Sequence, residues 1–367
     1  TTMLNTLKPL MKLSLLGISF IVLPLAAGLP DRLQQPSPQT NAAFSVMLTD
    51  IARADDRLVA VGDLGVVIYS DDQGQQWQQS SVPVTTLLTS VHFTSAQRGW
   101  ATGHDGVLLR SDDAGASWTL QLDGDQINQL KVASLHAQLD ALAETPSEDP
   151  YVEEDLQFAL DDAEFALEEG PANPLLNVWF ENAETGFLLG AYGTALKTTD
   201  AGESWQLISE RLPNPDQMHL NAITQLNGAL VIAGEAGLLM RSDDQGDSWY
   251  ALPSPYQGSF FDLVSHRDEL FALGLRGHLF VSADGGFDWE AVPVDTTVSF
   301  MGGFSDSQQL AIVGLGGTLL SGEQYADLAE LNTRVRRHFN AVVAIPAGWV
   351  LAGEQGIYTY LPQGDGQ

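Results

Sequence analysis

A Gly-x-x-Gly turn recurs along nearly the whole chain, and this repeat restricts the possible folds more than any other feature of the sequence. Its first glycines are 39 to 44 residues apart, except for one gap of 87 that equals one period plus an insertion of about 45 residues. A period of about 40 residues indicates a repeat architecture in which each unit packs on its neighbours. The seven copies are Gly62–Gly65, Gly103–Gly106, Gly190–Gly193, Gly234–Gly237, Gly274–Gly277, Gly314–Gly317 and Gly353–Gly356.

Each of the first six units contains four short stretches with the composition of strands. In the second unit they are residues 90–93, 99–102, 107–110 and 118–121. Short alternating runs bounded by Gly and Asp are strands joined by hairpins. Four strands in about 40 residues, repeated seven times, predict an all-β fold, a seven-bladed β-propeller with four-stranded blades over residues 42–361.

The first five units share a Ser/Thr-x-Asp-x-Gly-x-x-Trp motif, the Asp-box, between their last two strands. Its carboxylate can accept backbone N–H groups across a tight turn, its glycine can take a positive φ, and its tryptophan can bury a ring against the neighbouring sheet. We interpret the boxes as hairpin-stabilising structure, with a calcium or sugar site as the alternative. The residues concerned are Asp72, Trp77, Asp113, Trp118, Asp200, Trp205, Asp244, Trp249, Asp284 and Trp289.

The seventh unit stops after three predicted strands, which would leave an exposed sheet edge. The extended stretch Phe44-Ser45-Val46-Met47 precedes the first complete unit. We expect it to supply the outer strand of blade seven.

Residues 124–173, between units two and three, do not alternate. Apolar residues at helical spacing predict two helices, over 126–143 and 151–169, separated by a Pro-containing break. Residues 122–172 hold 14 Asp and Glu and one Lys, a net charge of −13. This acidic α-helical hairpin is either a solvated decoration or a docking arm for a partner with a basic or apolar surface. Its candidate partner-binding residues are Glu153, Glu154, Asp155, Asp161, Asp162 and Glu164.

The overall charge and composition exclude several classes of function. The chain has 16 Lys and Arg against 47 Asp and Glu, a net charge of −31, so nucleic-acid binding is not expected. With no cysteine, disulfides, thiolate metal sites and a cysteine nucleophile are excluded. No phosphate-binding, dinucleotide-binding, metalloprotease or serine-hydrolase motif occurs, so we expect neither catalysis nor a cofactor nor a metal.

A candidate recognition surface is the ring of Gly-x-x-Gly turns. Polar side chains converging around the central channel of a propeller would form a binding surface. The alternative is that these residues serve only the turns themselves. The candidate residues are Asp63, His104, Asp105, Tyr192, Glu235, Arg276 and Glu354.

The N-terminus has the layout of a secretory signal. Lys8 and Lys12 precede an apolar run from Leu13 to Ala27, and small residues follow it. We expect residues 1–29 to be a signal peptide or an N-terminal anchor and residues 30–41 to be a linker, which places the protein in the periplasm or another extracytoplasmic space.

Asp-boxes also occur in sialidases, so a glycan-directed binder or a sialidase-like glycoside hydrolase is the alternative function. These enzymes hold the substrate carboxylate with three arginines. Arg334, Arg336 and Arg337 form the one basic cluster of the sequence. A glycan-directed function would require arginines gathered in the central channel.

Seven such units, with runs such as Gly-Trp-Ala-Thr-Gly-His-Asp-Gly at 99–106 and Lys-Thr-Thr-Asp-Ala-Gly-Glu-Ser-Trp at 197–205, resemble the photosystem II stability/assembly factor family. The resemblance implies an exported, non-enzymatic, seven-bladed propeller that binds a membrane-protein client as a scaffold.

Two departures from the photosynthetic members affect the expected client. Arg276 is the one basic side chain among the turn residues, where those members are expected to carry a basic patch, and the acidic insertion has no expected counterpart. The chain is more similar to the non-photosynthetic bacterial branch, which implies an integral membrane protein or membrane complex as partner, for example a transporter complex of the resistance-nodulation-division kind.

Overall fold

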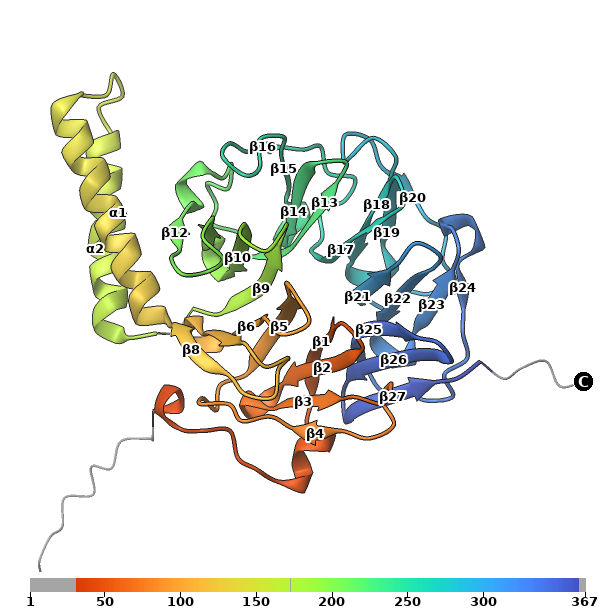
Figure 1. Ribbon diagram of the computed structural model, residues 1–367. Coiled ribbons are helices and arrows are strands. Elements are labelled where there is room, and N and C mark those ends of the chain that lie inside the picture. The colour runs from red at the N-terminus through yellow and green to blue at the C-terminus, as the bar shows by residue number, and fades with distance from the viewer. Residues whose placement is uncertain (1–30, 172, 363–367) are drawn as a thin grey trace, which may run out of the picture. The chain divides into compact units, whose positions relative to one another are not determined.

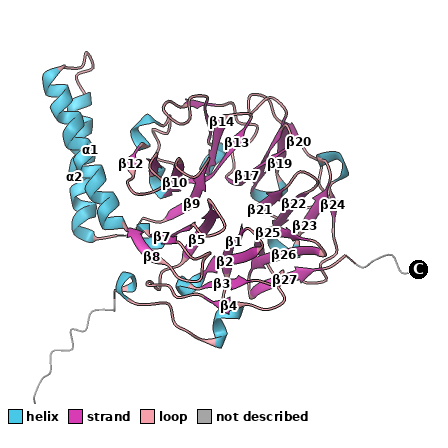
Figure 2. Ribbon diagram, in the orientation of Figure 1, coloured by secondary structure: helices cyan, strands magenta, loops and turns pink. Residues whose placement is uncertain are grey.

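The computed structural model describes residues 31–171 and 173–362, and within them the strands form seven antiparallel sheets arranged in a ring (Figures 1 and 2). This confirms the predicted seven-bladed propeller. Blades one to three contain β1 (Leu48–Ala54), β2 (Arg57–Gly62), β3 (Val67–Ser70), β4 (Gln78–Gln79), β5 (Leu88–Phe93), β6 (Gly99–Gly103), β7 (Leu108–Ser111), β8 (Thr119–Leu122), β9 (Leu175–Phe180), β10 (Gly186–Gly190), β11 (Ala195–Thr198) and β12 (Gln206–Leu207). Blades four to seven contain β13 (Leu220–Leu226), β14 (Ala229–Gly234), β15 (Leu239–Ser242), β16 (Tyr250–Ala251), β17 (Phe260–His266), β18 (Glu269–Gly274), β19 (Leu279–Ser282), β20 (Glu290–Ala291), β21 (Phe300–Ser305), β22 (Leu310–Gly314), β23 (Leu319–Gly322), β24 (Ala329–Glu330), β25 (Phe339–Ile345), β26 (Gly348–Gly353) and β27 (Gly356–Tyr360).

Each blade is a meander in which every strand pairs with the next one along the chain. The first strand of a blade lies nearest the centre of the ring and the last lies at the rim (Figure 1). The Gly-x-x-Gly turns and the connections between blades therefore share one face, which we call the turn face, and the Asp-box hairpins lie on the opposite box face. A backbone hydrogen bond of 2.8 Å from His104 N to Leu87 O joins a turn to such a connection.

Hydrophobic cores fill the joints between blades. The described residues form seven buried clusters, each shared by two neighbouring blades. One joins Val59 of blade one to Leu109 of blade two, and another joins Ile68 of blade one to Val350 of blade seven. Full burial of such a side chain stabilises the fold by about 1.5–3 kcal/mol.

Polar side chains on the inner strands bind the backbone of the next blade. Because each bond joins two inner strands, it fixes their separation around the channel. The bonds run from Thr49 to Leu88 O (2.8 Å), from Thr89 to Leu175 O (2.7 Å), from Asn221 to Phe260 O (2.7 Å), from Gly303 N to Asp262 (2.8 Å) and from Asn340 to Leu48 O (2.7 Å).

Blade seven has three strands, so the prediction of an outer strand at 44–47 is wrong. Residues Asn41–Ser45 instead form a 3-10 helix, η2, capped by Thr40, whose hydroxyl accepts a 3.2 Å hydrogen bond from Ala42 N. The outer position lies three strand spacings, roughly 14 Å, from the inner one. Blade one uses residues 80–87 to cover that distance, whereas β1 begins at Leu48, directly after the predicted strand.

The 3-10 helix η2 nevertheless occupies the place of a connection between blades. Phe44 O lies over Gly356 in blade seven as Val84 O lies over Gly65 in blade one, and a Cβ on either glycine would collide with that carbonyl. Residues 41–47 thus cover blade seven on the turn face without adding a strand.

The segment predicted as a linker is packed on the propeller from Arg32 onward. Ser37 N donates to Val82 O at 2.9 Å, and Thr85 N donates to Arg32 O at 2.9 Å. Its partners are backbone groups of the first connection between blades, which composition alone does not reveal. The predicted signal peptide or anchor lies outside the described residues.

The insertion forms the predicted helical hairpin, which stands at the rim beside blades two and three (Figure 1). Helix α1 (Gly124–Glu144) begins with a capping box in which Asp123 and Gln126 exchange hydrogen bonds. Helix α2 (Val152–Glu169) ends at Gly170, which has a φ of 94°. Neither these helices nor any other in the described part of the chain is long and apolar enough to cross a membrane.

Two inner-strand carboxylates that take part in the contacts between blades are half-buried and line the channel. Burial raises the pKa of Asp50 to about 6, against the opposing effect of hydrogen bonds such as the one from Val91 N. Burial likewise raises the pKa of Asp262 to about 7, and the nearby charge of Asp50 adds to the increase. The folded chain therefore holds these protons at a pH where the unfolded chain has lost them.

The bond between Asn340 and Leu48 O closes the ring between its last and first blades. Asn221 makes the equivalent bond to Phe260 O between blades four and five, which the chain itself connects. We expect Asn340→Ala and Asn221→Ala each to lower the free energy of unfolding by about 1–3 kcal/mol, because each leaves a carbonyl without its donor. Only Asn340→Ala should also accelerate amide hydrogen exchange in β1 and β25, since no covalent link holds that joint. Equal exchange rates in the two variants would contradict a special role for the closing joint.

The raised pKa values predict that stability decreases as pH rises. In the folded chain Asp262 keeps its proton up to a pH of about 7, so its contribution to the free energy of unfolding falls as pH increases from about 4 to 7. The slope is at most about 1.4 kcal/mol per pH unit. Thermal unfolding between pH 5.5 and 8 should show a flatter pH dependence for Asp262→Asn than for wild type. The exposed-site control Asp295→Asn should keep the wild-type slope, and three parallel profiles would refute the assignment.

Candidate functional site

The seven candidate turn residues lie on the turn face but do not surround the channel. A cavity of 160 Å³ marks the channel, and inner-strand residues line it. The turns join the second and third strands of each blade and so lie farther from the centre (Figure 1). Asp63, His104, Glu235 and Glu354 take the first position after the turn's first glycine, and Asp105, Tyr192 and Arg276 take the second, with φ of 60°, 54° and 58°.

The acidic turn residues are engaged in local contacts. Asp105 is buried and binds Arg32 at 2.8 Å, which fixes the N-terminal segment to blade two. Glu235 lies 3.1 Å from His219 Nδ1, and Glu354 accepts a 3.3 Å hydrogen bond from His338 N. Of the predicted ring, Tyr192, Arg276 and Glu354 are exposed, and Tyr192 is 55% exposed.

The channel lacks the arrangement that a sialidase would need. Its described lining includes Asp50, Asp262, Asn177 and Asn340 but no arginine. Arg337 of the basic cluster instead lies over the ring of Tyr358, 4.9 Å from its centroid. The described residues contain no group of three side chains able to hold a metal ion.

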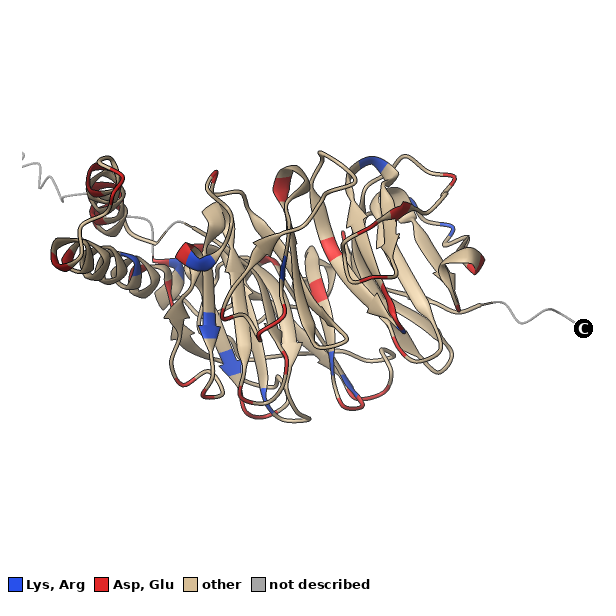
Figure 3. Ribbon diagram, turned by 90° about the horizontal axis from the view of Figure 1, so that it is seen from above, with Lys and Arg blue, Asp and Glu red and all other residues tan. Residues whose placement is uncertain are grey.

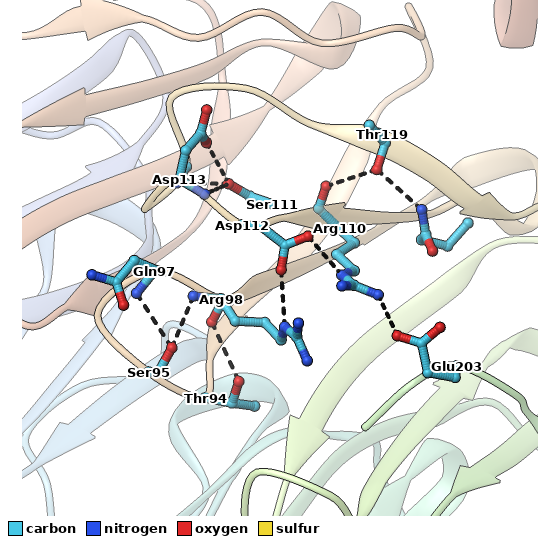
Figure 4. Close-up of polar contacts among 12 residues, drawn as sticks. Thr94, Ser95, Gln97, Arg98, Arg110, Ser111, Asp112, Asp113, Thr119 and Glu203 are labelled. Atoms are coloured by element: carbon cyan, nitrogen blue, oxygen red, sulfur yellow. Dashed lines mark hydrogen bonds and ion pairs between the residues drawn. The ribbon is translucent and has the colours of Figure 1, made fainter. Parts of the chain in front are cut away.

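The side chains of the Asp-boxes stabilise the hairpins in which they lie. In the box of blade two, Asp113 accepts a hydrogen bond from Ser111 Oγ at 2.8 Å (Figure 4). It accepts another from Ser117 N at 2.8 Å. Such bonds, chiefly from serine hydroxyls, lower the pKa of Asp200 and Asp244 to about 2. The box carboxylates are ionised, and their bonds are made to their own turns.

The box tryptophans pack at the joints between blades. Trp77, Trp118, Trp249 and Trp289 each donate from Nε1 to the carbonyl of the box glycine, at 3.0–3.3 Å. Trp205 is the exception among them, because its Nε1 is buried without a partner. Its ring packs edge-on against Trp100, with centroids 6.3 Å apart.

Cations compensate much of the acidic charge on the box face. Arg110 pairs with Asp112 of its own blade at 2.9 Å and with Glu203 of blade three at 2.7 Å (Figure 4). Lys197 repeats this pattern from blade three to blade four, where it binds Asp247 at 2.8 Å. Opposite charges thus meet across two joints on this face, between blades two and three and between blades three and four.

The helical hairpin has little such compensation. Lys131 is the one Lys or Arg in residues 124–173, and Figure 3 shows acidic positions along both helices. The predicted residues Glu153, Glu154, Asp155, Asp161, Asp162 and Glu164 are all exposed on α2. The structure therefore concentrates uncompensated negative charge on this helix.

Three exposed aromatic side chains accompany that charge. Tyr151, Phe158 and Phe165 are 66%, 61% and 58% exposed. Their spacing of seven residues places them on one stripe of the helix. We call this stripe and the acidic residues beside it, Glu154, Asp155 and Asp162, the outer face of α2.

The sequence prediction found the acidic residues of this face but not the aromatic ones. Leu160 and the other aliphatic residues at helical spacing supplied the helix signal, and they are buried or half-buried. The spacing of Tyr151, Phe158 and Phe165 was the signal that could have revealed a second, unburied stripe.

Two stretches of the chain, residues 31–128 and 164–258, match the model of the family described as photosynthesis system II assembly factor YCF48. Together they exceed half of the chain. The match omits residues 129–163, which hold most of the hairpin.

A curated relative, the photosystem II assembly lipoprotein Ycf48 of Synechococcus sp. (strain CC9902), is 38% identical over 84 residues. That match spans 23% of this chain and only 25% of the relative.

Solved structures share the fold. YCF48 bound to a D1 peptide has a TM-score of 0.58 and 15% identity, covering 86% of this chain and 92% of that one. YCF48 from Cyanidioschyzon merolae has a TM-score of 0.59 and 12% identity, with 88% and 97% covered. The fold agrees over the propeller and the family model matches more than half of the chain, so this protein belongs to the Ycf48 family of photosystem II assembly factor-like propellers.

Proposed function

We propose that this protein is a non-catalytic propeller that binds an integral membrane protein on the extracytoplasmic side of the membrane and assists its assembly or stability. The observation that carries the proposal is the outer face of α2, an exposed aromatic stripe bordered by uncompensated carboxylates. Exposed aromatic residues in a row are uncommon on a solvated helix and typical of a contact surface.

The chemistry of this face defines the partner surface. Phe158 and Phe165 would enter apolar depressions and supply most of the binding energy, as aromatic residues do at interface centres. Glu154, Asp155 and Asp162 would pair with lysines or arginines around those depressions and speed association. The partner surface is therefore apolar at its centre and basic at its border.

Family membership supports an assembly role. The relatives are photosystem II assembly factors, and one was solved with a D1 peptide. Tyr151 and Phe158 fall in the segment that the family model omits, so we infer a partner other than a photosystem. A periplasmic transporter complex of the resistance-nodulation-division kind is the client class that the resemblance to non-photosynthetic members favours.

The turn face is the proposed second part of the interface. Tyr192 and Arg276 are exposed there, and the hairpin emerges from the same face between blades two and three. A partner on the outer face of α2 could reach this face.

The test is co-purification of the tagged protein from its native membrane in mild detergent, with mass spectrometry of what accompanies it. We expect a stoichiometric integral membrane protein with wild type. Phe158→Ser with Phe165→Ser should reduce its recovery at least tenfold, and Glu154→Lys with Asp155→Lys should do the same. All four positions are exposed, so the melting temperature should change little.

Matched controls lie on blade five. Phe287→Ser removes an exposed aromatic residue, and Glu290→Lys with Asp295→Lys makes the same charge change, away from the hairpin. Both should keep the partner. The proposal fails if no membrane protein accompanies wild type, or if the α2 and blade-five variants behave alike.

A further inference from the structure

A groove separates the hairpin from blade three. It encloses 820 Å³, within the range of ligand-binding pockets. One wall is formed by α1 and α2, and the other by the turn at Tyr192 and the connection from blade three to blade four. Most of the hairpin wall lies in residues 129–163, outside the family match, so the groove combines a family propeller with an element peculiar to this chain.

Lys131 is an uncompensated cation in this groove. Its ammonium donates to Thr194 Oγ1 at 3.2 Å, and no carboxylate lies within ion-pair distance among residues 31–171 and 173–362. Burial lowers the pKa of Lys131, so its charged form lacks part of its hydration. The other lysine in the described part of the chain, Lys197, does have an acidic partner, at 2.8 Å from Asp247.

The remaining lining suits an extended polypeptide. Leu212, Pro213 and Pro215 form an apolar side, and the amide side chains of Gln138 and Gln217 can bond a peptide backbone. The Tyr192 ring stands at the groove beside His219, with centroids 5.0 Å apart.

The charge of the lining limits the anion that Lys131 could bind. Asp162 and Glu210 also line the groove, so one lysine faces two carboxylates. A phosphate dianion or nucleotide would meet net repulsion there, whereas a single carboxylate needs only one cation.

We propose that the groove between the hairpin and blade three binds an extended peptide segment whose carboxylate pairs with Lys131. The groove shares Asp162 with the outer face of α2 and Tyr192 with the turn face, but the proposal rests on Lys131 and the groove lining, which the proposed function does not use. The carboxylate is either a C-terminus or an Asp or Glu side chain.

Three pools of fluorescein-labelled heptapeptides test the site, each randomised over Ala, Leu, Val, Pro and Tyr. One pool has a free C-terminus, the second has an internal Glu and an amidated C-terminus, and the third is amidated without an acid. Anisotropy with the full chain should show binding of the first or second pool at least tenfold tighter than the third, and the better pool identifies the source of the carboxylate.

Two lysine variants assign the effect. Lys131→Met keeps a long apolar stem in the helix and should weaken the preferred pool about tenfold, the loss of roughly 1.4 kcal/mol of a charge-assisted bond. Lys197→Met removes the same charge on the box face and should leave binding unchanged. Tyr192→Ala should weaken the binding of every pool that binds but keep the preference for a carboxylate. The turn should tolerate this change, because the equivalent position in blade four is Ala236 with a similar φ.

A spectroscopic readout is independent of affinity differences between variants. In protein with ¹³C-dimethylated lysines, the preferred pool should shift the Lys131 signal and raise the pKa of Lys131, while the Lys197 signal stays fixed. The proposal is overturned if neither acidic pool binds, if the neutral pool binds equally well, or if Lys131→Met binds like wild type.

Discussion

The closed ring depends on side chains of five inner strands that reach the backbone of the next blade. Asn340 is the decisive case, because its 2.7 Å bond to Leu48 O joins the last blade to the first without a strand shared between them. Ile68 and Val350 meet in the buried cluster at the same joint. Closure therefore rests on side-chain contacts at a joint that is equivalent to the other six in packing but lacks a covalent connection.

Most of this architecture could be predicted from the sequence, because the turn glycines and box residues are each required by local geometry. A Cβ at Gly65 would strike Val84 O, and Gly74 needs a φ of 84°. The conformation of residues 41–47, which cover blade seven, could not be predicted in the same way. Residues 44–47 have the composition of a strand, but Thr40 caps a 3-10 helix at this position. The chain must also return from the rim to the centre before β1. A repeat pattern shows neither the cap nor this distance.

The candidate site was predictable only in part, for a related reason. The turn residues were expected at the channel because a linear pattern does not give the distance of a turn from the axis, and these turns join the second and third strands rather than the inner one. The acidic residues of α2 were recognisable by composition alone, whereas Phe158 and Phe165 match the sequence pattern of buried helical residues. Whether an apolar stripe is covered by a neighbour is a property of the tertiary structure, and here the stripe remains mostly exposed.

The position of the insertion explains how a regular ring and an added surface element coexist in one chain. Residues 124–173 replace a connection between an outer and an inner strand, so the inner-strand bonds and the buried clusters at the joints form without most of the hairpin. Ile127, at the base of α1, enters the cluster between blades two and three, whereas Tyr151 at the start of α2 is exposed. The hairpin is thus anchored rigidly at one end and free of packing constraints along its outer face. Substitutions on that face can therefore alter its chemistry without weakening the ring, because no joint between blades depends on its side chains.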